Sequence, residues 1–334
     1  MIFDVLWRRP LLQRPAPTAT ASTPDGVFVH ERSTRLVCLD PADGVARWDV
    51  PVGTWPRAVV ADGPQCWVIS QDRNELRCLD VRSGEVHWSV DLPRFTAHIV
   101  VAGDRVLVGG WRGYTALRAF DRWTGALLWA ERHRAATVLP AAVGERVLVG
   151  EPGGSSVRLL DVRDGTEVCR WSLPEPLVGG DGQWQAFVAA GPDRFLLRCG
   201  ARTLWQVNPG AGTAGEFFRH DRDLAATGIS TVGALVWARE RHRGAVALDL
   251  TPREFRGRVS VGPDVVGQVV PAAAGHVLAT GRPGMLLLVD DAGRPRERRL
   301  VDQQIGGLRP LMPGVLLVAG KGTLLAVDAA TPTA

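Results

Sequence analysis

Histidines flanked by charged side chains are the groups in this sequence best suited to acid–base chemistry. His98 lies near Arg94 at the expected start of a strand close to the molecular axis, where its side chain can point into a central funnel. His133 stands between Arg132 and Arg134, whose positive charges favour a neutral imidazole that can accept a proton. We therefore take both histidines as candidate catalytic residues. The alternative for His133 is a solvated loop residue.

A third candidate, His220, is followed closely by Asp221 and Asp223. A histidine beside carboxylates can form an acid–base pair or contribute to a metal site, but the run His-Asp-Arg-Asp is equally typical of a polar loop. Glu240 and His242 form a similar pair in the run Arg-Glu-Arg-His-Arg. We take His220 as a candidate catalytic residue and predict no metal site.

Arginines close to aromatic rings indicate a second kind of chemistry, the binding of ligands. A guanidinium group pairs bidentately with carboxylate or phosphate and also stacks on aromatic faces, so such clusters suit anionic or flat aromatic ligands. The alternative is that these arginines are solvated, because the whole chain favours arginine and Lys321 is its only lysine. The candidate ligand-binding residues are Trp55, Arg57, Arg94, Trp111, Arg112, Tyr114, Arg132, Trp184, Arg239 and His242.

Familiar enzyme motifs are absent from the sequence. It contains no GxSxG, HExxH, GxxxxGK or EF-hand loop, which argues against the standard hydrolases, kinases and metalloproteases. An enzyme whose site is assembled from several loops stays open, since a motif search cannot detect such a site.

The composition is that of a soluble globular protein. The 334 residues are 46% hydrophobic and 22% charged, with a net charge of +4 and no apolar run long enough to cross a membrane. We expect no cleaved signal and no membrane partner. The five cysteines include no CxxC pair, which fits a reducing cytoplasm. Without clustered basic residues, the small positive charge argues against nucleic acid binding.

One sequence phrase, LxxLDxxxGxxxW, recurs along the whole chain. It is clearest at 35–48, 75–88 and 116–129, while at 157–171 the tryptophan comes two residues later. The anchor residues follow one another at intervals of 38 to 47 residues, close to the four-stranded unit of a β-propeller blade. They are Asp40, Asp80, Asp121, Asp161, Asn208, Asp249, Asp290 and Asp328.

Each repeat is expected to supply four antiparallel strands, two before the phrase and two within it. The aspartate accepts hydrogen bonds from turn amides, the glycine takes a positive φ, and the tryptophan fills space between neighbouring sheets. Strands such as 106–110 and 286–290 are apolar almost throughout, as expected when neighbouring blades cover both faces of a sheet. The sequence therefore predicts an all-β, eight-bladed propeller.

The two ends of the chain complete each other in this scheme. Too few residues follow Asp328 to form a fourth strand, whereas FDVLWRR near the N-terminus resembles the fourth-strand run GALLWAER. We predict that residues 2–8 complete the blade formed by 308–330, within a single domain spanning 1–334. The alternative is that residues 2–8 are a frayed tail.

The LDxxxGxxxW phrase, with VLVGG before it, resembles the repeat of the PQQ-like (quinoprotein-type) eight-bladed propellers. That superfamily includes quinoprotein alcohol dehydrogenases, a scaffold lipoprotein of outer-membrane assembly, and modules attached to kinases. The dehydrogenases are much longer and carry an adjacent Cys pair that this sequence lacks, which argues against PQQ as a cofactor. The resemblance therefore implies a fold, not an activity.

Two functions follow as hypotheses from different classes. The first is a cytoplasmic binding or scaffold module that holds a protein partner, or an anionic or aromatic small molecule, on loops rich in Arg, His and Trp. The second is a cofactor-independent lyase, cyclase, isomerase or hydrolase of specialised metabolism, with a histidine as acid–base group in the axial funnel and arginines that stabilise negative charge. The sequence leaves open whether the protein is an enzyme.

Overall fold

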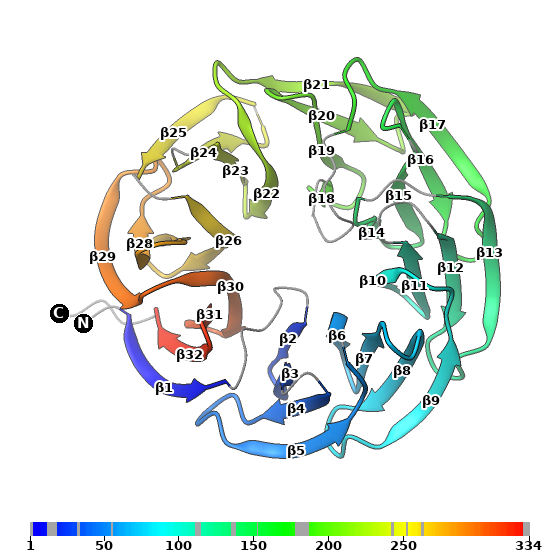
Figure 1. Cartoon of the computed structure of the whole chain (residues 1–334). Coiled ribbons are helices and arrows are strands. Elements are labelled where there is room, and N and C mark those ends of the chain that lie inside the picture. Colours follow the sequence, from blue (N-terminus) through cyan, green and yellow to red (C-terminus); the bar gives the residue numbers. More distant parts are fainter. Residues whose placement is uncertain are drawn as a thin grey trace.

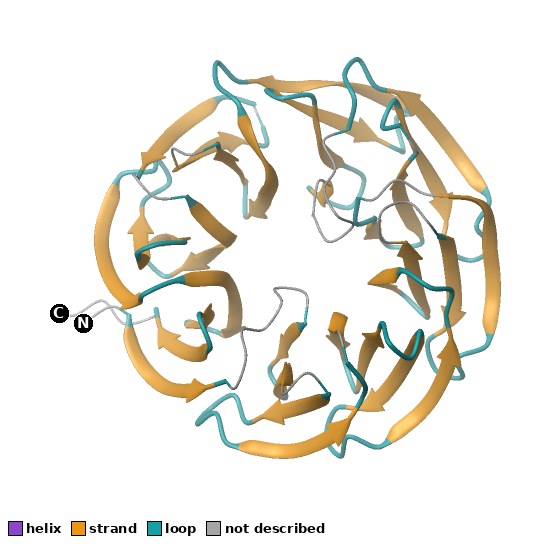
Figure 2. Ribbon diagram, in the orientation of Figure 1, coloured by secondary structure: helices purple, strands orange, loops and turns teal. Residues whose placement is uncertain are grey.

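A computed structural model describes residues 3–11, 19–31, 34–54, 56–110, 115–134, 138–151, 153–177, 187–241, 244–251, 253–261 and 264–329. Within these ranges the regular structure consists of β-strands, arranged as eight four-stranded antiparallel sheets around a central axis (Figures 1 and 2). The predicted eight-bladed, all-β propeller is confirmed. In the part of the chain described, no helix has the length and apolar character to span a membrane.

The strands of each blade follow one another from the axis to the rim of the ring (Figure 1). Blade one contains β2 (Thr20–Thr23), β3 (Gly26–Glu31), β4 (Arg35–Leu39) and β5 (Ala46–Pro51). Blade two contains β6 (Pro56–Asp62), β7 (Gln65–Ser70), β8 (Glu75–Asp80) and β9 (Val86–Asp91). Blade three contains β10 (Thr96–Ala102), β11 (Arg105–Gly110), β12 (Ala116–Asp121) and β13 (Leu127–Arg134). Blade four contains β14 (Ala141–Val143), β15 (Arg146–Gly150), β16 (Ser156–Asp161) and β17 (Glu167–Ser172).

The second half of the ring repeats this order. Blade five contains β18 (Phe187–Ala189), β19 (Phe195–Cys199), β20 (Thr203–Asn208) and β21 (Thr213–Arg219). Blade six contains β22 (Leu224–Val232), β23 (Leu235–Glu240), β24 (Gly244–Asp249) and β25 (Phe255–Ser260). Blade seven contains β26 (Val265–Ala272), β27 (Gly275–Thr280), β28 (Gly284–Val289) and β29 (Pro295–Asp302). Blade eight contains β30 (Ile305–Met312), β31 (Val315–Gly320), β32 (Thr323–Asp328) and, from the other end of the chain, β1 (Asp4–Pro10).

Strand β1 closes the ring. It pairs antiparallel with β32, from Asp4 opposite Asp328 to Pro10 opposite Thr323, and forms the outer edge of blade eight. The inner strands β2 and β30 lie in contact, which joins blade eight to blade one. The prediction that the N-terminal segment completes the last blade is confirmed, although the strand begins at Asp4 and extends two residues beyond Arg8.

The hydrophobic core is divided among the interfaces between neighbouring blades. Each of the eight interfaces holds one cluster of buried apolar side chains. Strands β3 and β7 are buried along their whole lengths, because a blade stands on each side of them. The outer strand β5 is mostly exposed. This pattern explains the continuous apolar runs of the sequence.

The recurring turn fits the tryptophan of the preceding blade. Gly125 has φ 73°, and a Cβ added to it would lie 2.7 Å from the Trp88 ring, so the ring packs against the turn backbone. Trp88 Nε1 donates a hydrogen bond to the carbonyl of Arg122 in the same turn (3.0 Å). The Asp121 carboxylate accepts the amide hydrogen of Thr124 (2.8 Å). These contacts lock adjacent blades together and give the repeated Asp, Gly and Trp structural roles.

Candidate functional site

The candidate functional site lies on the loop face of the ring, between blades five and six. We define the loop face as the side that carries the loops leading from one blade to the next, such as 219–224, and the loops between second and third strands, such as 240–244. The turn face is the opposite side, which carries the Asp-containing turns such as 121–125.

Backbone hydrogen bonds hold the loop that leads from blade five to blade six. The His220 amide donates to the carbonyl of Arg202 (2.9 Å), and the Leu224 amide donates to the carbonyl of Ala201 (2.8 Å). On the other side, the Arg241 amide donates to the carbonyl of Asp223 (2.9 Å). The loop is therefore tied to a loop of each blade, which fixes the directions of its side chains.

Four charged or titratable side chains meet at this place. His220 Nε2 lies 2.5 Å from Glu240 Oε1, and His220 Nδ1 lies 3.2 Å from Asp221 Oδ1. Arg258 Nε donates to both carboxylate oxygens of Glu240, at 2.9 and 3.0 Å. The side chains of His220 and Glu240 are buried, whereas Asp221 is exposed. His220 and Asp221 lie on the loop after β21, Glu240 ends β23, and Arg258 lies on the outer strand β25. These segments are separate in the sequence, and the fold brings them together.

The electrostatics of this cluster favour an ionised Glu240. Burial by itself raises the pKa of a carboxyl group, but hydrogen bonds from Arg258 and His220 outweigh it and lower the pKa of Glu240 below its ordinary value. Interaction with Glu240 in turn raises the pKa of Arg258. The pair therefore behaves as a buried salt bridge that joins β23 to the outer strand of its own blade.

The same cluster has the donor set of a divalent metal site. One ligand atom each from His220, Asp221 and Glu240 can be chosen so that all three lie within 4.8 Å of one another. Imidazole nitrogen and carboxylate oxygen are ligands that zinc and related ions accept. However, the Arg258 guanidinium already hydrogen-bonds both oxygens of Glu240, so the cluster contains its own cation. A metal ion would have to displace Arg258.

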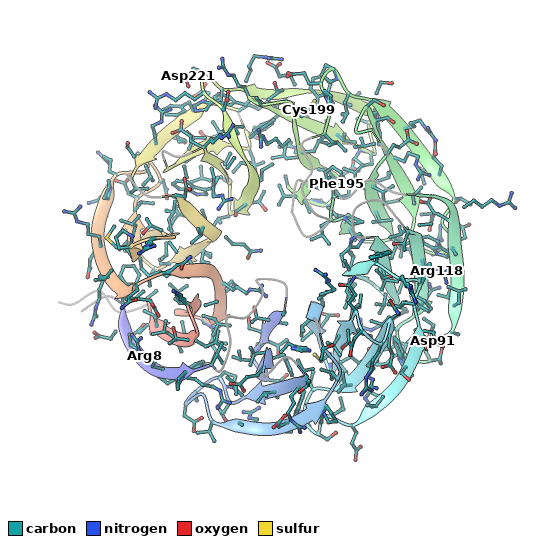
Figure 3. The ribbon with its side chains drawn as sticks, viewed as in Figure 1. Arg8, Asp91, Arg118, Phe195, Cys199 and Asp221 are labelled. Carbon is teal, nitrogen blue, oxygen red and sulfur yellow. The ribbon has the colours of Figure 1, made fainter. Side chains whose placement is uncertain are left out.

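The cluster does not lie in an axial funnel. Figure 3 shows Asp221 at the outer edge of the ring, beyond the inner strands. His220 therefore does not lie in the axial funnel, where we expected a catalytic histidine. His98 is also placed differently from the expectation, because it is 2% exposed on β10 and its ring packs against the backbone of Gly109. It shares its face of the strand with Val100, which packs in the cluster between blades three and four.

The predicted ligand-binding arginines occupy separate places on the ring. Arg57 donates from Nε to Gln71 Oε1. Arg94 and Arg132 are exposed, in the loop before β10 and near the end of β13. Arg239 donates from Nη1 to the carbonyl of Val265, and burial lowers its pKa. The structure does not gather these four side chains into one pocket with His220.

Several predicted site residues lie outside the described part of the chain. His133 belongs to β13, but its side chain is not described. The other predicted residues in this group are Trp55, Trp111, Arg112, Tyr114, Trp184 and His242. Their proposed roles stay predictions.

Sequence reasoning missed Arg258 and the repeated position that Glu240 occupies. Glu31 and Glu240 end the second strands of their blades, and Glu151 follows the second strand of blade four directly. All three form salt bridges near the loop face, Glu31 with Arg9 (3.0 Å) and Glu151 with Arg170 (2.8 Å). Only two of the eight second strands end in glutamate, so an alignment of the repeats gives a weak signal for this position.

Comparisons with known proteins agree with the geometry of the ring. The sequence profile of the family described as outer membrane protein assembly factor BamB matches residues 72–333. No curated protein sequence matches the chain.

Solved structures of similar shape extend over the whole chain. The crystal structure of BamB from Moraxella catarrhalis aligns with a TM-score of 0.78 and 16% identity, covering 100% of both chains. The computationally designed Ika8 protein aligns with a TM-score of 0.78 and 13% identity, covering 98% of this chain and 99% of that one. Sqt1 from Saccharomyces cerevisiae aligns with a TM-score of 0.79 and 10% identity, covering 99% and 100%. At these identities the similarity establishes the fold alone.

Proposed function

This chain belongs to the PQQ-repeat family described as outer membrane protein assembly factor BamB, and we propose from that membership that it is a scaffold that holds a protein partner on its loop face. The name of the family refers to the assembly of other proteins, which supports a protein partner over a small molecule. Scaffold proteins need a rigid surface with unpaired charge or exposed apolar groups, and the loop face meets this need with charge.

The observation that carries the proposal is that several loop-face arginines have no carboxylate partner among the described residues, although others on that face, such as Arg9 and Arg170, are paired. On the turn face, the anchor aspartates neutralise nearby arginines: Asp40 binds Arg47, Asp161 binds Arg163, Asp249 binds Arg256 and Asp290 binds Arg294. Arg82 and Arg253 also lie on the turn face, but they form no salt bridge with a described residue. On the loop face, Arg94, Arg132 and Arg241 form no salt bridge with any other described residue. Such arginines suit a partner with an acidic surface.

The enzyme alternative has less support. Both ring nitrogens of His220 face carboxylates, and its side chain is 5% exposed. A general base needs a free nitrogen within reach of the substrate. We therefore do not assign His220 a catalytic role.

Site-specific photocrosslinking tests the proposed function. A photoreactive amino acid is placed singly at Arg94 and Arg132 on the loop face and at Arg82 and Arg253 on the turn face, and crosslinking is carried out in the cells that produce the protein. We expect one partner to be captured repeatedly from the loop-face positions. Equal capture from the turn-face positions, or none from the loop face, would contradict the proposal. The double variant Arg94→Glu and Arg132→Glu should lose the partner, whereas the corresponding lysine variant should retain it.

A further inference from the structure

The guanidinium of Arg198 is buried with two of its nitrogen atoms unpaired. Arg198 lies on β19, on the same face as Leu196, which packs between blades five and six. The residue is 5% exposed, and Nη2 donates to the carbonyl of Ala201 (3.1 Å). Among the described residues, Nε and Nη1 have no hydrogen-bond partner. A buried donor without an acceptor is costly, and proteins usually satisfy it with water, an ion or a ligand.

One carboxylate is shared among three guanidinium groups at this place. Asp223 accepts a hydrogen bond from Arg202 Nε (2.9 Å). Its pKa is lowered first by that hydrogen bond and further by the positive charges of Arg202, Arg241 and Arg198. Burial lowers the pKa of Arg198 to about 10, with Asp223 opposing this effect and Arg241 adding to it. Among the described residues, the positive charges of Arg198, Arg202 and Arg241 therefore act on Asp223, and Arg198 donates no hydrogen bond to it.

We propose that Arg198 and Arg241, together with the neighbouring Arg202, form an anion-binding site on the loop face that receives a carboxylate side chain from an acidic segment of the protein partner. A carboxylate is a strong acceptor for a guanidinium and would accept a hydrogen bond from an unpaired nitrogen of Arg198. The inference rests on the proposed scaffold function and names the chemistry of the segment that is bound.

The frame of this site is rigid and partly open. The Leu224 amide and Arg198 Nη2 both donate to the carbonyl of Ala201, and the Arg241 amide donates to Asp223, so the three arginines are held on one network of backbone contacts. Asp223 is half-exposed and Arg241 is exposed, so the outer part of the site is open to solvent. Nε and Nη1 of Arg198 are covered, so the Arg198 side chain must shift to meet an incoming carboxylate. The adjacent cluster of Glu240 and Arg258 is internally paired and has no such surplus of positive charge.

Binding of a defined acidic peptide to the whole protein tests this site. The probe is fluorescein-labelled hexaglutamate, followed by fluorescence polarisation at low salt, with hexaglutamine as the uncharged peptide. We expect hexaglutamate to bind and hexaglutamine not to bind, and the affinity to fall as salt screens the charges. Arg198→Met and Arg241→Gln should each weaken hexaglutamate binding about tenfold, because each removes charge-assisted hydrogen bonds. Arg219→Gln is the matched control, since Arg219 is already paired with Glu216 and Glu175.

Three results would overturn the inference. The first is an affinity of Arg198→Met and Arg241→Gln equal to that of the wild type, and the second is an equal loss in Arg219→Gln. The third is displacement of hexaglutamate by micromolar inorganic phosphate, which would identify a phosphate site instead of a carboxylate site. The exposed variant Arg241→Gln keeps the test decisive if Arg198→Met fails to fold.

Thermal unfolding separates ligand binding from a structural role of Arg198. Removal of an uncompensated buried charge should leave the melting temperature of Arg198→Met unchanged or raise it, whereas hexaglutamate should raise that of the wild type only. Lower stability with unchanged peptide binding would assign Arg198 a purely structural role. Photocrosslinking of a partner without hexaglutamate binding would disprove the site and leave the scaffold function intact. Hexaglutamate binding without loop-face crosslinks would support the anion-binding site and contradict the scaffold function.

Discussion

Trp7 Nε1 donates a hydrogen bond to the carbonyl oxygen of Pro41 over 2.8 Å, and this contact joins the N-terminal strand to the turn of blade one. The Trp7 ring also packs on Gly44, whose φ is 72°. Trp88 makes the same contacts with the turn of blade three. Trp7 is therefore the repeat tryptophan of blade eight, supplied from the opposite end of the chain, and it completes the ring by the same interaction that joins the other blades.

The role of Trp7 in closing the ring leads to a stability prediction. Trp7→Ala should lower the free energy of unfolding by about 3–5 kcal/mol, because it removes a buried aromatic side chain at the junction between blades eight and one. Chemical denaturation followed by circular dichroism measures the change. Trp123→Ala is the control: Trp123 is 54% exposed, so we expect a loss of less than about 1 kcal/mol. Equal losses in the two variants would show that Trp7 has no special role.

Two glycines on the turn face, one in the repeated turn and one between a first and a second strand, allow a comparison. Gly125 and Gly63 have φ of 73° and 55°, but a Cβ at Gly125 would clash with the Trp88 ring, whereas one at Gly63 meets open space. Gly63→Ala should cost about 1 kcal/mol for the strained backbone alone. Gly125→Ala should cost clearly more, because the Trp88 ring must also move. Thermal unfolding of both variants tests this order, and a smaller cost at position 125 would contradict the packing explanation.

The fold could be predicted from the sequence because its signal is local and repeated. The Asp and Gly of each repeat shape one turn, and the Trp of the neighbouring outer strand packs on that turn. The spacing of Asp40, Asp80 and Asp121 therefore gives the length of one blade directly. Even the closing strand was recognisable, because Trp7 keeps the sequence context of a fourth strand.

The candidate site could be predicted only in part, because it is assembled across blades. His220 and Asp221 are neighbours in sequence and were recognised, but Glu240 reaches them from β23 and Arg258 from β25. A single sequence does not reveal that Arg258 neutralises the very carboxylate that His220 contacts. Arg198 was missed for a similar reason, since nothing local distinguishes a buried arginine on an apolar strand from one that reaches solvent.

The buried Glu240 predicts a specific loss of stability in acid. Its pKa is lower in the folded chain than in the unfolded one, so its contribution to stability is complete above the unfolded value of about 4.3 and is lost as the pH falls through the folded value. The difference in free energy of unfolding between the wild type and Glu240→Gln should therefore narrow as the pH is lowered from about 5. Urea denaturation at a series of pH values measures it. A difference that stays constant down to pH 3 would contradict the assignment.

Arg258 determines whether the neighbouring cluster can bind a metal ion. Arg258→Met leaves Glu240 buried without its cation, which should cost about 3–5 kcal/mol. His220, Asp221 and Glu240 would then present three ligand atoms without a competing guanidinium. We expect Zn²⁺ to raise the melting temperature of Arg258→Met by several degrees and that of the wild type by much less, because only the variant lacks an internal cation. The double variant Arg258→Met and His220→Ala should lose the response to Zn²⁺. A large shift in the wild type would instead show that a metal displaces Arg258 and that the cluster is a metal site in the native protein.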